Sequence, residues 1–132
     1  MAGRPFLATI DQHIAAGHVS VKVTLGVGDE IYVGIADGPE DSQHRARLVG
    51  EATLRAVEEA VGGATTFYLS AVATTDLGPV KVALAQVRDD GWSDYLVGSA
   101  LVREADPSTA TAKAVLDALN RRITHRGNPA AN

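Results

Sequence analysis

The sequence has no cysteine and fewer basic than acidic residues. The absence of cysteine excludes disulfide bridges, thiolate metal ligands and cysteine nucleophiles, and it favours a reducing compartment, the cytoplasm. Twelve Lys and Arg residues against sixteen Asp and Glu residues give a formal net charge of -4, which disfavours contact with a phosphate backbone. Nucleic acid is therefore not expected as a partner.

Long hydrophobic runs are also missing. No apolar stretch approaches the roughly 18 residues of a membrane span, and the apolar patch near the start is interrupted by Asp11 and His13. Neither a membrane segment nor a signal peptide is expected. The length of 132 residues and the 45% hydrophobic content are typical of one globular domain. We expect an amino-terminal segment at 1–17, a single domain at 18–124 and a flexible tail at 125–132.

Hydrophobic periodicity predicts five strands and two helices. Period-two alternation predicts strands at 18–25 and 31–36, joined by a glycine-rich turn, and three further strands at 66–74, 80–87 and 95–102. Helical spacing predicts one helix over 41–61, ended by Gly62 and Gly63, and a second from Asp106 and Pro107 to about Ile123. The fold class is therefore α+β. We expect two layers with the order ββαβββα, in which about five mainly antiparallel strands carry both helices on one face.

An internal repeat relates the two parts of the chain. Val33, Gly34 and Ala36 recur as Val97, Gly98 and Ala100 at an offset of 64, and the two helices match at an offset of 62. Each helix carries alanine at spacings of four, which predicts close packing of helix against sheet. The alanines are Ala52, Ala56 and Ala60 in the first helix and Ala110, Ala114 and Ala118 in the second. We infer a strand-helix duplication.

Catalytic and metal-binding motifs are not evident in the sequence. The four histidines have no ligand spacing, and the segment Gly26-Val27-Gly28 lacks the third glycine of a dinucleotide fingerprint. None of the serines lies in a G-x-S-x-G elbow. We therefore predict no catalytic residues, no metal site and no cofactor.

The most plausible ligand site lies where a strand runs into a helix start. Free amides gather at such a junction, and the repeat is expected to bring an equivalent loop near it, which together suggest a pocket for an anion or an amino-acid carboxylate. The alternative is two ordinary capped helices, with Asp37 and Asp106 already satisfying the amides. The candidate ligand-binding residues are Gly34, Ala36, Asp37, Gly38, Gly98 and Ser99.

Three stretches resemble one known family. They are 34–39 leading into the helix with Ala56, 80–88 with its following turn, and 106–123 with the segment Asp117-Ala118-Leu119-Asn120-Arg121. Together they resemble the carboxy-terminal regulatory domain of α-isopropylmalate synthase, which binds leucine and dimerises. The likeness covers about 18–123, and the family also has a duplicated strand-helix unit. The resemblance implies a free-standing relative of that domain, without synthase activity because the chain has no room for the synthase barrel.

Three classes of function follow. The leading one is a non-enzymatic homodimeric regulatory or interaction module that senses a small metabolite or modulates a protein partner. The second is a double-stranded RNA-binding module. Such modules have the order helix, three strands, helix, which is also predicted for residues 41–123, but Asp106-Pro107-Ser108-Thr109 stands where a basic cluster is expected. The third is an enzyme with an intersubunit site that uses Asp37, His44 or Asp94.

Self-association is expected to use strand or sheet surface outside the helices. The prediction depends on apolar side chains that two alanine-rich helices are too small to cover. They are Tyr32, Phe67, Leu69 and Trp92.

Overall fold

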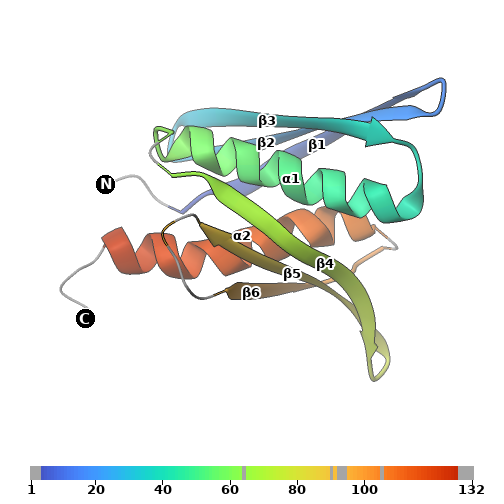
Figure 1. Cartoon of the computed structure of the whole chain (residues 1–132). Helices are drawn as coiled ribbons and strands as arrows, with labels where there is room; N and C mark the ends of the chain where they lie inside the picture. Colours follow the sequence, from blue (N-terminus) through green and yellow to red (C-terminus); the bar gives the residue numbers. More distant parts are fainter. Residues whose placement is uncertain (1–3, 64, 90, 92–94, 105, 128–132) are drawn as a thin grey trace.

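The computed structural model describes residues 4–63, 65–89, 91, 95–104 and 106–127, and its elements follow the order βββαβββα (Figure 1). The elements are β1 (Phe6–Ala15), β2 (His18–Val27), β3 (Glu30–Pro39), α1 (Ser42–Ala60), β4 (Phe67–Leu77), β5 (Val80–Asp89), β6 (Leu96–Leu101) and α2 (Pro107–Gly127). The strands form two antiparallel three-stranded sheets. Sheet A has the order β1-β2-β3 and sheet B the order β4-β5-β6. The chain is thus α+β, and each half contributes one sheet and one helix.

The prediction of five strands in the order ββαβββα is wrong by one strand. The sixth strand is β1, which occupies most of the segment 1–17. Almost all of its side chains are exposed, and its middle reads Asp11-Gln12-His13, so it lacks the apolar alternation that a half-buried strand would show. Backbone pairing with β2 holds β1 in the sheet, together with Leu7 and Ile10, which are partly buried against the core.

The expected packing of both helices on one sheet face is also wrong, because each helix covers its own sheet. Gly34 of β3 lies against α1, where an added Cβ would overlap the carbonyl oxygen of Ala52 and the amide of Ala56. Gly98 of β6 lies against α2 at the equivalent oxygen of Ala114 and amide of Ala118. Glycine is required here because the backbones approach too closely for a side chain. The alanine stripes therefore pack against the sheets, as predicted.

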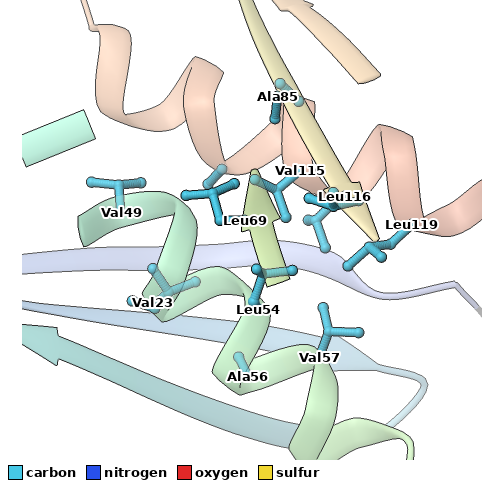
Figure 2. Packing of buried hydrophobic residues seen from close by; sticks show 14 of the residues in the cluster. Val23, Val49, Leu54, Ala56, Val57, Leu69, Ala85, Val115, Leu116 and Leu119 are labelled. Atoms are coloured by element: carbon cyan, nitrogen blue, oxygen red, sulfur yellow. The ribbon is translucent and has the colours of Figure 1, made fainter. Parts of the chain in front are cut away.

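The core lies where the two halves meet (Figure 2). Leu54 and Val57 of α1 and Leu119 of α2 are fully buried and belong to one hydrophobic cluster with Leu69 of β4, as Figure 2 shows. Besides covering sheet A, α1 packs against β4 and α2. Sheet A covers only one side of α1. Without the contacts to β4 and α2, the remaining apolar surface of the helix would be exposed.

The helix boundaries agree with the sequence at three of four ends. Asp41 caps α1, whose backbone continues to Val61 before Gly62 and Gly63 adopt positive φ angles of 79° and 73°. Pro107 is the first residue of α2, as predicted. The fourth end differs, since α2 continues to Gly127 and includes the first three residues of the predicted tail. Residues 128–132 lie outside the described part of the chain.

The residues from which self-association was predicted are not the exposed ones. Phe67 and Leu69 are buried within the chain, at 3% and 7% exposure, and Tyr32 is half-buried. Trp92 lies outside the described residues. Leu69 reaches the core because α1 leaves room for it at Gly50, where an added Cβ would lie 2.8 Å from Leu69 Cδ2. The exposed apolar side chains lie elsewhere, on the outer faces of the two sheets.

Candidate functional site

The six predicted ligand residues are distributed over two sheets. Gly34, Ala36 and Gly38 alternate along β3, and Gly34 and Gly38 lie against α1. Asp37 lies between them on the strand and is exposed. In sheet B, Gly98 lies against α2 and Ser99 is exposed. The two glycines are therefore packing residues of separate helix-sheet contacts, and the structure does not gather the six residues around one pocket.

The two helix starts are capped by aspartates of their own. Asp41 Oδ1 accepts the His44 amide at 2.9 Å, whereas Asp37 is still part of β3. At the second helix Asp106 Oδ1 accepts the Thr109 amide at 3.2 Å, and Asp106 Oδ2 accepts the Thr109 hydroxyl at 2.6 Å. The hydroxyl bond, and then the amide bond, hold the pKa of Asp106 below its usual value. A negative cap at each start leaves little attraction for an anion.

The proposed acid-base residues are engaged or lie outside the described chain. His44 Nδ1 lies 2.6 Å from Asp41 Oδ2, so this histidine belongs to the cap of α1. Asp37 Oδ2 lies 3.9 Å from His18 Nε2, and both side chains are exposed. Asp94 falls outside the described residues. Two histidine-aspartate pairs thus exist, both on open surface where proton transfer to a sequestered substrate is not favoured.

A cavity that sequence reasoning missed lies between the two halves of the fold. It has a volume of about 650 Å³ and is formed by the start of α1, the β4-β5 hairpin and the first turn of α2. Its lining residues are Glu40, Arg45, Ala46, Thr74, Lys81, Pro107, Ser108 and Thr111. A cavity of this size can hold a metabolite of ordinary size.

A polar network joins the halves beside this cavity. Arg45 forms an ion pair with Glu40, and its Nη1 donates to Gln12 Oε1 at 2.6 Å. The same Gln12 donates from Nε2 to Ser108 Oγ at 3.3 Å, which links β1 and α1 to the start of α2. Arg45 Nε is buried and has no hydrogen-bond partner among the described atoms. An unpaired buried donor is uncommon and costs stability unless something binds it.

The opposite wall supplies a second cation. Lys81 Nζ lies 3.1 Å from Asp76 Oδ1, and more than half of its side chain is exposed. Thr74 stands on the neighbouring strand, and Thr111 is buried at 3% exposure on α2. The lining therefore combines two cations, one carboxylate and three hydroxyl groups. No histidine and no second carboxylate line this cavity, so among its described walls the groups are suited to recognition and not to acid-base chemistry.

No local sequence signal identifies this cavity. Arg45 and Lys81 are 36 positions apart, and their proximity depends on how sheet B packs against α1. Gln12 lies 33 positions from Arg45 and 96 from Ser108, on the strand that the sequence did not predict. A spacing argument works only where one helix or turn carries the whole site.

Similarity to known proteins and other groups of side chains do not identify a further site in this chain. No protein-family model matches the chain, and no curated protein is significantly similar to it. Within the described residues, no three histidine, aspartate or glutamate side chains come together to hold a metal ion. The helices that the structure describes are too short or too polar to cross a membrane.

Proposed function

We propose that this protein is a non-enzymatic, homodimeric regulatory module of the cytoplasm that senses a small metabolite in the cavity between its halves. The observation that carries the proposal is the cavity itself, because its walls come from both halves of the fold. A ligand that contacts both walls stabilises their packing, and ligand binding then changes the surface that the module presents to a partner.

The chemistry of the lining favours a ligand with at least one acidic group. Arg45 and Lys81 supply positive charge from opposite walls, and hydroxyl groups of Ser108 and Thr74 supply further hydrogen bonds. Each cation has a carboxylate partner, since Arg45 pairs with Glu40 and Lys81 with Asp76, so the ligand meets groups of both charges. A zwitterionic amino acid or a small carboxylate matches this distribution.

The resemblance to the regulatory domain of α-isopropylmalate synthase supports the same class of function. That likeness, with the βββα unit present twice, is the reason for proposing a free-standing relative of a metabolite-binding domain. Leucine therefore belongs in any ligand screen, together with the other amino acids.

A thermal-shift screen tests the proposal. The purified protein is heated with each of the twenty amino acids, with small dicarboxylates and with nucleoside phosphates. A ligand at 100 times its Kd adds about 2.7 kcal/mol to the free energy of unfolding, which is a readily measured rise in Tm. A screen without any rise favours a pure interaction module and contradicts metabolite sensing.

A pair of lysine variants locates the binding site. Lys81→Met removes a cation from the cavity wall. Lys22→Met removes an exposed lysine from the face of sheet A that points away from α1. We expect the ligand-induced rise in Tm to fall in Lys81→Met and to persist in Lys22→Met. Equal loss in both variants, or in neither, would place the ligand elsewhere.

A further inference from the structure

Strand β3 forms one edge of sheet A and carries a row of exposed apolar side chains. Among the described strands only β2 pairs with it, so its other edge offers unpaired backbone groups. Ile31, Val33 and Ile35 are 70%, 39% and 58% exposed, and alternation places all three on the face away from α1. A long apolar edge strand is a template for pairing with another strand.

Each of the other sheet edges makes contacts within the chain over part of its length. On β4, the Phe67 carbonyl accepts from Arg55 Nη2 at 2.8 Å, and the Phe67 amide donates to Glu58 Oε2 at 2.7 Å. On β6, the Ser99 amide donates to Asp117 Oδ2 at 2.9 Å. The remaining edge strand, β1, borders α2. Side-chain bonds to edge amides and carbonyls block strand addition, so β3 is the edge best suited to it.

The row on β3 is complementary to itself. If two copies of β3 run antiparallel about a two-fold axis at Val33, Ile31 lies opposite Ile35 of the second copy and Val33 lies opposite its own counterpart. On the inner face Tyr32 then lies opposite Gly34 of the second copy, and Gly34 itself stays buried against α1. The equivalent row in sheet B consists of Tyr95, just before β6, and Val97 and Ser99 of β6, and it would set tyrosine opposite serine.

Helix α1 provides an independent match in charge. Arg47, Glu51, Arg55 and Glu59 follow one another at spacings of four along α1. Within the chain Arg47 pairs with Glu51 and Arg55 pairs with Glu58, and both arginines also donate to carbonyl groups of β4. An antiparallel copy centred at Thr53 places Arg47 opposite Glu59 and Glu51 opposite Arg55, so that opposite charges face each other. The two centres lie at the same level along strand and helix, because Gly34, next to Val33, lies against the helical turn between Ala52 and Ala56.

We propose that β3 pairs antiparallel with β3 of a second copy of this chain, about a two-fold axis at Val33, to form a continuous six-stranded sheet. The inference rests on the homodimer of the proposed function and adds the contact surface and its register. The occupant is a second copy because both the apolar row and the charge column become complementary under the same two-fold operation.

Cysteine cross-linking tests the register, because the natural chain contains no thiol. Opposed residues of an antiparallel pair have Cα atoms about 4.5–5.5 Å apart, within disulfide range. We expect Val33→Cys to form a disulfide-linked dimer under mild oxidation. Val97→Cys, at the equivalent position of β6, serves as the matched control and should remain largely monomeric on a non-reducing gel. Ile31→Cys and Ile35→Cys should link with each other and not with themselves.

A second pair of variants measures the contact without oxidation. Ile35→Glu places a charge opposite Ile31 of the second copy twice per dimer, and it should weaken the dimer roughly tenfold or more. Ser99→Glu, at the equivalent exposed position, should leave the dimer Kd unchanged. Circular dichroism of both variants establishes that they fold.

The outcomes separate this inference from the proposed function. Light scattering that gives a monomer mass at micromolar concentration overturns the homodimer and the β3 contact together. A dimer mass with equal cross-linking of Val33→Cys and Val97→Cys, or an unchanged Kd in Ile35→Glu, overturns the β3 contact alone. A dimer that is lost in Ile35→Glu and links through Val33→Cys supports both.

Discussion

A methyl group at position 34 should cost more stability than a methyl group four residues further along the same strand. In Gly34→Ala the new Cβ lies well inside 3.0 Å of the Ala52 carbonyl oxygen and the Ala56 amide. Both neighbours are helix backbone, which moves only with the whole of α1. In Gly38→Ala the nearest atom is Leu48 Cδ2 at 3.4 Å, an ordinary contact with a mobile side chain.

The loss of stability depends on how far β3 and α1 must move apart. Strand and helix have to separate by more than an ångström, which forfeits a quarter to a half of the dispersion energy along the Ala52 and Ala56 contact. Overpacking of this kind costs about 1–3 kcal/mol, and an unyielding backbone neighbour puts Gly34→Ala at about 3 kcal/mol. Gly38→Ala should stay within about 0.5–1 kcal/mol of the wild type, because the loss of unfolded-state entropy offsets any crowding. Gly98→Ala, which repeats the contact on α2, should resemble Gly34→Ala.

Urea unfolding followed by circular dichroism measures these differences. For a slope m of about 1.5 kcal/mol/M, a loss of 3 kcal/mol lowers the midpoint by about 2 M. All variants are compared at one protein concentration, since dimerisation adds to apparent stability. Equal midpoints for Gly34→Ala and Gly38→Ala would refute the close contact between β3 and α1, and with it the alignment of Val33 with the centre of the helix.

Two further predictions concern a turn and a cap. Ala16 has φ of 53° in the two-residue turn between β1 and β2, where Gly17 follows with φ of 77°. Asparagine tolerates this backbone conformation better than alanine, so Ala16→Asn should raise stability by about 0.5–1 kcal/mol, measured as a higher Tm. A fall in Tm would contradict the turn geometry. Asp106→Ala should cost about 1 kcal/mol at pH 7 through loss of the α2 cap. Because the pKa of Asp106 is lowered from 3.8 by the Thr109 bonds, its stabilisation is present above that value and is lost as the pH falls through the lowered folded-state pKa. The Tm difference between wild type and Asp106→Ala should therefore narrow toward pH 3, whereas a constant difference would show that the charge of Asp106 does not contribute.

The elements that sequence reasoning predicted are those held by local rules. Asp106 and Pro107 mark a helix start whatever the rest of the chain does, and Gly62 and Gly63 end a helix by their backbone freedom. Strands β2 and β5 alternate because one face of each is covered by a helix. These signals are contained within a few residues, so one sequence is sufficient to find them.

The features that sequence reasoning missed depend on long-range packing. Strand β1 is exposed on nearly all its residues and is held mainly by its pairing with β2, which leaves no hydrophobic pattern. The sequence does not predict the division into two sheets either. Strands β3 and β4 contain similar kinds of residues, and only their partner strands show that they belong to different sheets. The cavity is harder still to predict, because Arg45 and Lys81 line it together only when both halves of the fold have formed.

A comparison of the two halves separates packing residues from those suited to recognition. Both halves retain the glycine that lies against its helix, Gly34 or Gly98, and both place a strand irregularity at the same point, after Leu7 in β1 and after Leu69 in β4. The edges differ. Ile35 of β3 corresponds to Ser99 of β6, whose amide is bonded by Asp117, so the edge of β6 is blocked at this position and the edge of β3 is not. Two open edges would allow copies to add at both ends without limit, whereas one open and self-complementary edge ends assembly at two copies. The asymmetry of an otherwise repeated fold is thus what a closed dimer requires.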